Sequence, residues 1–579
     1  MRVKLNTVSW FVRFGPSGER MALFATAALV PIVVAFLVAI TFWTSVMRGV
    51  PGLGVTYTLS HYLAIYGDPF TYSALFNTLG FAATTVVVAL TFGIPIAWLV
   101  ERTEFPHRAL LYMLMVMSLV IPTFFVAMGW VLLLHPRMGF LNTWLRALFD
   151  SPSFTINITT ITGMGFVEGV SLAPLAFVMT AAGFRAMNPA LEEAAHVHGM
   201  GRLSSTFHVT LPLLFPSVLG ASIYIFVIGL AAFDVPAVIG LANRIYTFST
   251  LVYVKALAPE GVPQYGIPAA VGMLMFIVAL GFTWWYSKIL RFSRRYEVVS
   301  GRSYQKKRGT NGSQLVILGW VFCGVYLLLG IGIPLLLVIW AAITPYLQPP
   351  SMTALGLVSL EQFSRLPWDL VLRGAVNTLL LMFLVPTVVL VLCIPISWVI
   401  VRSGSRWRYT YEFLVFLPHA MPAIIFGVAA LVASLFILKN IIPIYGTIWI
   451  IALVYVVERI TFGSRVINGA LIQINSELEE VGYVSGLSIS SVLRAIFLPL
   501  LRPAILNAWL WMSLITYREL TIAAVLFTPT NITLPVVIWS FWTAGGMGPA
   551  AAVTLVMLAI LTPLVFVYWA VTSKSDTGW

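Results

Sequence analysis

Charged residues are scarce in this sequence of 579 residues: only 9% are Asp, Glu, Lys or Arg, and 60% are hydrophobic. A soluble protein carries about 25% charged residues, so this composition does not suit a surface that faces water. The mean hydropathy is +0.96. Apolar runs of roughly 20 residues recur along the chain, the length of a helix that crosses a hydrocarbon core. We therefore predict an all-α, polytopic membrane protein.

Cysteine and histidine are rare as well, with 2 and 7 residues. Cys323 and Cys393 both lie inside apolar runs, which argues against a disulfide framework or a zinc site. No apolar run gathers His, Asp and Glu on one face, as a membrane-embedded enzyme would. The chain also lacks G-x-x-x-x-G-K-[ST], the phosphate-binding loop of ATPases. We expect no catalytic residue, no metal site and no cofactor in this chain.

Twelve apolar runs are long enough to be membrane spans, which places both termini on one side. Most of the 33 Lys and Arg residues fall on that side, and the positive-inside rule marks it as cytoplasmic. The first run is too long for a signal-peptide core, so we interpret it as a retained span. The runs lie near residues 21–43, 74–100, 110–134, 166–187, 211–236, 266–290, 314–343, 373–401, 410–436, 446–468, 500–526 and 547–572.

The largest basic cluster follows the sixth run and divides the chain into halves of similar size. Contact with anionic lipid on the cytoplasmic side explains such a cluster, whereas nucleic-acid binding calls for a recognisable module. We expect a first half at 1–290 (core about 73–287), a basic linker at 291–313, and a second half at 314–579 (core about 373–570). The cluster consists of Lys288, Arg291, Arg294, Arg295, Arg302, Lys306, Lys307 and Arg308.

The two halves repeat one pattern. NTLGFAATTVVVALTFGIPIAWLVER at 77–102 parallels NTLLLMFLVPTVVLVLCIPISWVIVR at 377–402. Two halves of six spans with the same orientation form a parallel repeat about an axis along the membrane normal, and such repeats enclose a pathway at their interface. The residues that recur are Asn77, Pro95, Trp98, Arg102 and Pro122, as Asn377, Pro395, Trp398, Arg402 and Pro422.

A polar segment repeats too: LEEAAHVHGMGRLSSTFHVTLPLL at 191–214 and LEEVGYVSGLSISSVLRAIFLPLL at 478–501. Both copies precede the fifth span of their half on the cytoplasmic side. Ser476 and Glu479 have the spacing of a capping box, and Gly199 or Gly486 can end a helix in the left-handed conformation. We predict a short helix, a break and a second helix, which suits a groove in another protein.

These residues resemble the EAA loop, E-A-A-x3-G-x9-I-x-L-P, of binding-protein-dependent ABC importer permeases with MetI-like halves. The copies depart from it at Val209, which replaces isoleucine, and at Val481-Gly482, which replaces the alanine pair. The resemblance implies that both loops contact a separate ATPase. It assigns this coupling to Glu192, Glu193, Ala194, Ala195, Gly199, Leu211, Pro212, Glu479, Glu480, Val481, Gly482, Gly486, Leu498 and Pro499.

The resemblance also implies a cellular location and partner proteins. It implies a multi-pass protein of the bacterial inner membrane, with two copies of an ABC ATPase subunit on the cytoplasmic side and a binding protein on the other. ATP and Mg would be used by the ATPase, and neither nucleic acid nor a cofactor would bind this chain. An ion-coupled secondary transporter is the rival class. It would place charges at the midplane of several spans and have no paired docking loops.

The fused halves resemble the iron(III) group of these permeases. The stretches that carry this resemblance are FDVPAVIG at 233–240, Tyr265-Gly266 and TYRELTIAAVLFTP at 516–529. Permeases for thiamine, aminoethylphosphonate and polyamines share much of the same pattern, so these substrates remain alternatives.

Charged residues within apolar runs are costly and therefore informative. Asp234 and the pair Arg518-Glu519 lie near the outer ends of the fifth and eleventh runs. Two interpretations stand: they line the pathway or contact the binding protein, or they pair with one another or reach the interface. Glu458-Arg459 in the tenth run is interpreted as a structural pair. His196, His198 and His208 do not repeat in the second copy and are not expected to form a zinc site.

Overall fold

The computed structural model describes residues 17–50, 54–151, 153–188, 190–257, 265–293 and 313–575. Long helices dominate, and the strands in these residues, β1 (Met47–Val50) and β2 (Gly54–Tyr57), form one antiparallel hairpin. The predicted all-α membrane class is therefore confirmed. Residues 294–312 of the predicted linker lie outside the described part of the chain.

The helices before this linker include four long ones, α1, α3, α7 and α12, with shorter helices between them. Their bounds are α1 (Ser17–Val46), α2 (Ser60–Gly67), α3 (Pro69–Arg102), α4 (Arg108–Ser118), α5 (Thr123–Leu134), α6 (Phe140–Leu148), α7 (Ile161–Ala186), α8 (Ala190–Val197), α9 (Arg202–Ser205), α10 (Leu211–Ala231), α11 (Phe248–Ala256) and α12 (Gly266–Ser293). A π-helical turn at Thr206–Thr210 joins α9 to α10, and another at Pro236–Gly240 follows α10.

The helices after the linker follow a similar order. Their bounds are α13 (Ser313–Leu327), α14 (Ile333–Ile343), α15 (Met352–Leu355), α16 (Glu361–Ser364), α17 (Trp368–Val401), α18 (Arg408–Ala420), α19 (Ala423–Val432), α20 (Ile448–Gln473), α21 (Glu477–Val484), α22 (Ile489–Val492), α23 (Leu498–Tyr517), α24 (Thr521–Leu526), α25 (Leu534–Thr543) and α26 (Met547–Ser575). A π-helical turn at Leu493–Phe497 joins α22 to α23.

The described residues contain eight helices long and apolar enough to cross a membrane, or up to eleven if each of three bent pairs counts as one span. Twelve spans thus remains a prediction. α20, the predicted tenth span, is not among the eight, and it carries Glu458 and Arg459. The helices α11 and α25, which follow the predicted fifth and eleventh spans, were not predicted.

The runs at 110–134 and 410–436, each predicted as one span, are both bent at a break. Each is a bent pair, α4 with α5 at 91° and α18 with the helix from Ala423 to Ile437 at 99°. Pro122 and Pro422 stand at the breaks with extended ψ values of 134° and 133°. A proline starts a helix easily but cannot donate the hydrogen bond that would continue one. The recurring prolines therefore mark two equivalent breaks.

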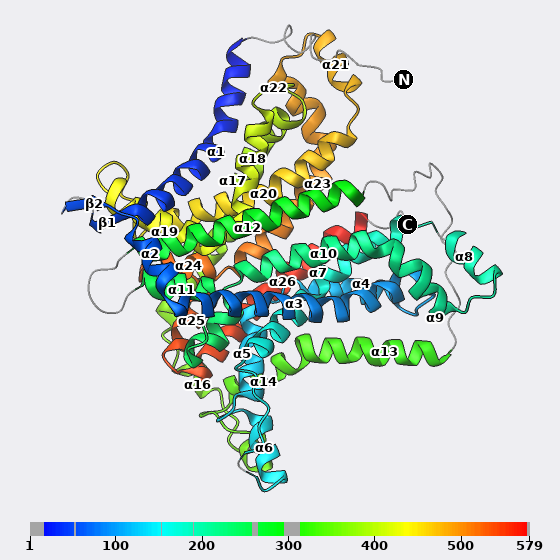
Figure 1. Ribbon diagram of the computed structural model, residues 1–579, viewed down its shortest axis with the longest axis vertical. Coiled ribbons are helices and arrows are strands. Elements are labelled where there is room, and N and C mark those ends of the chain that lie inside the picture. The colour runs from blue at the N-terminus through cyan, green and yellow to red at the C-terminus, as the bar shows by residue number, and fades with distance from the viewer. Residues whose placement is uncertain are drawn as a thin grey trace.

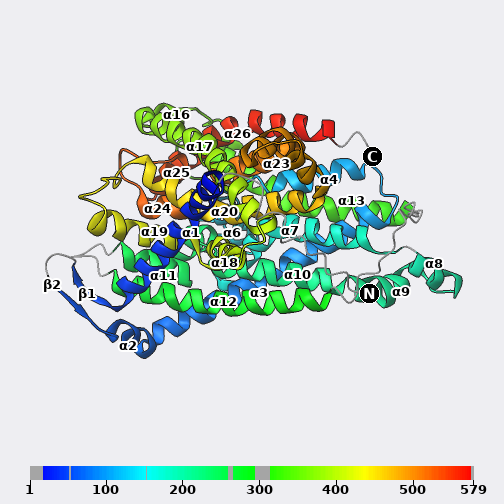
Figure 2. The same ribbon diagram turned by 90° about the horizontal axis from the view of Figure 1, so that it is seen from above.

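The first long helix on each side of the linker packs against the other side. α1 packs against α17, α18 and α19, and also against α12, while α13 and α14 pack against α3, α5 and α26. The arrangement can be followed in Figures 1 and 2, where α1 lies beside α17 and α18. α1 buries a stripe at helical spacing, formed by Ala27, Val30, Val34 and Leu37, which is how an apolar helix joins a larger core.

Close approach of small residues holds α3 against α7. A Cβ atom added at Gly93 would lie 2.6 Å from the Cβ of Ala176, and one at Gly169 would lie 2.6 Å from the Cβ of Val88. Small residues drive helix association in lipid, since they let two backbones approach closely. The second helix of this closely packed pair, α7, is followed directly by the first polar segment.

Candidate functional site

Both polar segments adopt the predicted helix, break and second helix. In the first, α8 is followed by α9, the π-helical turn and α10; in the second, α21 is followed by α22, the π-helical turn and α23. We call them docking segment 1 (190–212) and docking segment 2 (477–499). In Figure 1 they lie at the ends of different groups of helices, with α8 at the right and α21 at the top.

The predicted break glycines have the predicted conformation. Gly199 has a φ of +82° and Gly486 a φ of +81°, both in the left-handed region. A Cβ at either position would have no neighbouring atom within 4 Å. The requirement for glycine is therefore conformational rather than steric, because left-handed backbone is costly for residues with a Cβ.

Asn188 caps the first helix start, and Asn475 caps the second in place of the capping box predicted there. Asn188 Oδ1 accepts the N–H of Ala190 at 3.0 Å, and Asn475 Oδ1 accepts the N–H of Glu477 at 3.2 Å. Ser476 has helical dihedral angles and no side-chain capping bond, so the capping box of Ser476 and Glu479 was wrong. The carboxylate of Glu479 is turned toward other partners.

An arginine joins each docking segment to two membrane helices. Arg402 follows α17, and its Nη2 donates to the carbonyl oxygens of Leu471 at 2.8 Å and Ile474 at 2.6 Å, at the end of α20. Its Nε lies 3.8 Å from Glu479 Oε2. Three elements therefore meet at one guanidinium, whose planar set of N–H donors suits several acceptors at once.

Docking segment 1 repeats this junction. Arg102 ends α3, and its Nη2 donates to the carbonyl oxygen of Met187 at 3.4 Å, at the end of α7. Its Nη1 lies 3.6 Å from Glu192 Oε2, and Thr210 donates to the other carboxylate oxygen, Glu192 Oε1, at 2.6 Å. Arg102 and Arg402 recur in the sequence, but no pattern there indicated these partners.

The two glutamates differ in burial. Glu479 is fully buried, and Tyr483 donates to its Oε1 at 3.1 Å. Burial raises the pKa of the Glu479 carboxyl, and the hydrogen bond from Tyr483 and the charge of Arg402 only partly oppose that rise. The side chain of Glu192 keeps 21% of its surface exposed. Docking segment 2 is therefore the more deeply anchored of the two.

The remaining predicted coupling residues divide into an inner and an outer set. Ala195 and Gly482 face inward, and a Cβ at Gly482 would lie 3.0 Å from side-chain atoms of Val492 and Ile496. The outer set is exposed and consists of Glu193, Ala194, Glu480 and Val481. The Leu-Pro pairs, Leu211-Pro212 and Leu498-Pro499, start α10 and α23 directly after a π-helical turn.

Exposed valines mark the outer face of both short helices. Val197 is 84% exposed and Val484, at the matching position, is 87% exposed. The leucines that open the two copies, Leu191 and Leu478, are exposed as well. Apolar side chains displayed at equivalent points of two polar segments indicate a contact surface.

The histidines of docking segment 1 bind locally. Nδ1 of His198 lies 2.8 Å from the carbonyl oxygen of Ala194, and Nδ1 of His208 lies 2.9 Å from that of Ser204. The side chain of His196 lies outside the described part. Among the described residues, no group of three or more His, Cys, Asp and Glu could hold a metal ion.

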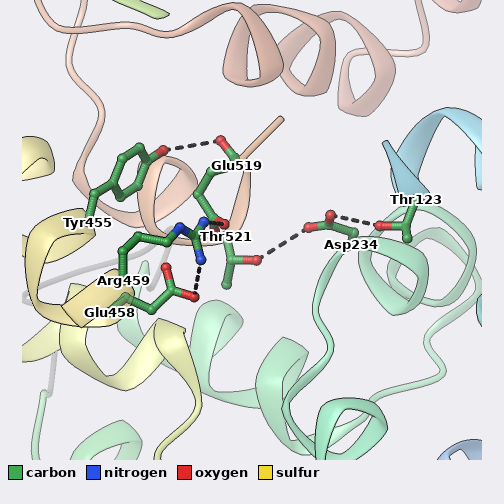
Figure 3. A network of polar contacts seen from close by, with 7 residues as sticks. All are labelled: Thr123, Asp234, Tyr455, Glu458, Arg459, Glu519 and Thr521. Atoms are coloured by element: carbon green, nitrogen blue, oxygen red, sulfur yellow. Dashed lines mark hydrogen bonds and ion pairs between the residues drawn. The ribbon is translucent and has the colours of Figure 1, made fainter. Parts of the chain in front are cut away.

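A second polar site, the buried charge cluster, lies among the helices and comprises Asp234, Glu458, Arg459, Arg518 and Glu519. Figure 3 shows these residues except Arg518. Arg459 lies between two carboxylates, 2.7 Å from Glu458 Oε1 and 2.7 Å from Glu519 Oε2. The predicted pair Glu458-Arg459 therefore forms, and Glu519 extends it. Arg459 thus pairs with two carboxylates at once, which lowers the cost of holding these charges away from water.

Asp234 and Arg518 link the helices before the linker to those after it. Thr521 donates to Asp234 Oδ1 at 3.3 Å across a separation of 287 residues, the separation that also relates Glu192 to Glu479. Thr123 donates to Asp234 Oδ2 at 2.9 Å. Arg518 Nη1 donates to the carbonyl oxygen of Ile121 at 2.8 Å, at the break between α4 and α5.

Glu168, in α7, is a member of this site that no sequence pattern singled out. Its side chain is 4% exposed, and its Oε2 has no hydrogen-bond partner in the described residues. The charges that act on it are those of Asp234 and Arg518. The matching position of the second half holds Tyr455, whose hydroxyl donates to the carbonyl oxygen of Glu519 at 3.1 Å. Glu168 therefore has no repeat that would reveal it.

Comparison with known proteins gives these two sites a context. Residues 89–296, which contain docking segment 1, match the family described as "Binding-protein-dependent transport system inner membrane component". This match covers just over a third of the 579 residues. Members of this family are inner-membrane components of transport systems, and the described residues of this chain include at least eight helices long and apolar enough to cross a membrane. Together these findings indicate a multi-pass inner-membrane protein.

Individual relatives extend the similarity beyond residue 296. The ferric transport system permease protein FbpB of Actinobacillus pleuropneumoniae is 24% identical over 467 residues, covering 79% of this chain and 64% of the relative. The Fe(3+)-transport system permease protein FbpB 2 of Haemophilus influenzae is 22% identical, covering 84% of this chain and 87% of the relative. The molybdenum transport system permease protein ModB of Escherichia coli is 26% identical over 39% of this chain.

Proposed function

We propose that this protein is the membrane-spanning permease subunit of an ABC importer. It receives substrate from an extracytoplasmic binding protein and moves it by alternating access, driven by ATP hydrolysis in two copies of a partner ATPase. The observation that carries this proposal is the pair of equivalent docking segments, each tied to its membrane helices through one arginine. An ion-coupled transporter has no use for two such segments.

The docking segments would seat α8 and α21 on the two ATPase subunits. Their exposed valines, Val197 and Val484, supply apolar contact area of the kind that a short helix presents to a groove. Arg102 and Arg402 would pass the displacement of each segment to α3 with α7 and to α17 with α20. ATP and Mg would be held by the ATPase, and both termini of the permease would be cytoplasmic.

The substrate pathway would run between residues 1–290 and 314–579, past the buried charge cluster. Supporting this, Asp234 and Thr521 hydrogen-bond across the two halves, and Arg518 reaches the break at Ile121. These contacts would hold the pathway shut toward the binding protein and separate when it opens outward. Asp234, Arg518 and Glu519 would then both pair with other groups and line the pathway, so the two interpretations of these residues are compatible.

Iron(III) is the substrate that the relatives favour, since two ferric permeases from different bacteria each align with about four fifths of the chain. Thiamine, aminoethylphosphonate and polyamines are the alternatives. The test is to reconstitute the permease with its ATPase and binding protein in proteoliposomes. Iron(III) on the binding protein should stimulate ATP hydrolysis and enter the vesicles. Stimulation by another of these ligands, and not by iron(III), would replace the substrate and leave the transport class intact.

A further inference from the structure

Glu19 makes a contact between the start of α1 and docking segment 2. Its Oε2 accepts the backbone N–H of Ile489 at 3.1 Å, and its Oε1 accepts the hydroxyl of Ser490 at 2.9 Å. Ile489 and Ser490 are the first two residues of α22, whose cap, Ser488, binds the N–H of Ser491 at 3.3 Å. Both carboxylate oxygens of Glu19 are thus used on one helix start.

The charge of Glu19 suits this place. The first N–H groups of a helix have no partner within it, and a carboxylate there is favourable. α22 runs through the π-helical turn into α23, so the start of this long helical run is what Glu19 holds. Burial raises the pKa of the Glu19 carboxyl, but the hydrogen bonds from Ser490, Ser488 and Ile489 outweigh it, and the net pKa is lowered. Glu19 is therefore an anion at neutral pH.

α1 is placed to carry this contact further. It packs against α17, α18 and α19 on the side of docking segment 2, and against α12, which belongs to the first half. A second polar contact fixes it near the same end, because the Tyr411 hydroxyl of α18 donates to the carbonyl oxygen of Phe24 at 3.2 Å. The helix that Glu19 joins to α22 therefore contacts both halves of the chain.

Docking segment 1 is built differently at the matching positions. Gly201 replaces the cap Ser488, and Arg202 and Leu203 replace Ile489 and Ser490. α13, the first helix after the linker, has no acidic residue in its first turn. The sequence thus offers docking segment 1 no equivalent of Glu19 on that helix.

We propose that Glu19 is a positioning residue that fixes docking segment 2 on α1, so that its displacement reaches the first half through α1 and α12. This inference rests on the proposed function for the role of the displacement. The contact itself is independent of it.

Hydrogen exchange in the full permease–ATPase complex tests the contact. In Glu19→Ala, exchange of the backbone amides at Ile489–Ser491 should rise roughly tenfold, the effect of losing a charge-assisted hydrogen bond. Glu19→Gln keeps an acceptor oxygen and should show a smaller rise. Glu412→Gln is the matched control, since Glu412 is an exposed acid on α18, and should leave these amides unchanged. Unchanged exchange in Glu19→Ala would overturn the positioning role.

The ratio of substrate transported to ATP hydrolysed tests the transmission. Glu19→Ala should lower this ratio severalfold, and Glu412→Gln should leave it unchanged. An unchanged ratio together with faster exchange would overturn the route through α1. If the loaded binding protein does not stimulate ATP hydrolysis by the wild-type complex, the proposed function is contradicted. The hydrogen-exchange measurement needs no ATP turnover, so it still tests whether Glu19 contacts docking segment 2.

Discussion

Arg402 lies 3.8 Å from Glu479, and Arg102 repeats this contact in the first half at 3.6 Å from Glu192. Each arginine also donates to a backbone carbonyl oxygen at the end of the membrane helix that precedes its docking segment. Arg102 donates to Met187 after α7, and Arg402 donates to Ile474 after α20. In each half, one arginine therefore connects the docking segment to two membrane helices.

Removing one arginine should loosen its docking segment. Arg402→Met leaves Glu479 buried without its cation, a change that costs about 3–5 kcal/mol in buried pairs, so the melting temperature and the ligand-stimulated ATPase activity should both fall. Arg102→Met should be milder, because Glu192 is partly exposed. The double variant Arg402→Met/Glu479→Met should recover part of the lost stability. A double variant no more stable than Arg402→Met would argue against a direct coupling of the pair.

Bulky residues at the break glycines should uncouple hydrolysis from uptake. Gly199→Leu and Gly486→Leu force a residue with a Cβ into left-handed backbone, at roughly 1–2 kcal/mol each, which should reorient α8 or α21. The protein should still insert in the membrane, with uptake per ATP reduced severalfold in proteoliposomes. Gly469→Leu is the control, because Gly469 has no atom within 4 Å of a built Cβ and no positive φ. Normal uptake by both variants would contradict the coupling role of Gly199 and Gly486.

The raised pKa of Glu479 predicts a pH dependence. Its folded pKa lies above the ordinary value of 4.5 because burial disfavours the charged form. The folded state then binds the proton more tightly than the unfolded state, so stability falls as pH rises from 4.5 through the raised pKa. Thermal unfolding of the wild type should show this decline, and Glu479→Gln should flatten it. Equal slopes for the two proteins would assign the pH dependence to other groups.

Arg459 should be a stability residue of the buried charge cluster. Arg459→Met strips the cation from Glu458 and Glu519, both 2.7 Å away, and should cost about 3–5 kcal/mol. Arg365→Met breaks the exposed pair of Arg365 and Glu361 and should cost less than about 1 kcal/mol. Comparing thermal unfolding of the two variants checks this prediction. Equal losses of stability in the two variants would mean that the ion pairs of Arg459 contribute no more than an exposed surface pair.

The parts of the fold that repeat could be predicted from the sequence. The long apolar runs, the paired segments and the break glycines each leave a local signature twice, once in each half. The bends at Pro122 and Pro422 were visible as recurring prolines, but a window of hydropathy averages over a break of a few residues. The helices α11 and α25 are too short to register as spans.

The parts that depend on contacts distant in sequence could not be predicted. Glu168 has no equivalent in the second half, and Glu19 contacts a residue 470 positions away. The carbonyl partner of Arg102 lies at the end of α7 and is apparent only in the folded chain. The capping box at Ser476 does not form: Asn475, one residue earlier, accepts the N–H of Glu477, and the side chain of Glu479 is buried.

Cross-linking of both docking segments to the ATPase tests the central claim most directly. Cys323 and Cys393 are buried, so single cysteines introduced by Val197→Cys and Val484→Cys can be modified selectively. Both should cross-link to the ATPase subunit in membranes, whereas Leu148→Cys on α6, 76% exposed and at the bottom of Figure 1, should not. Cross-linking of Leu148→Cys alone, or of neither valine position, would contradict the account.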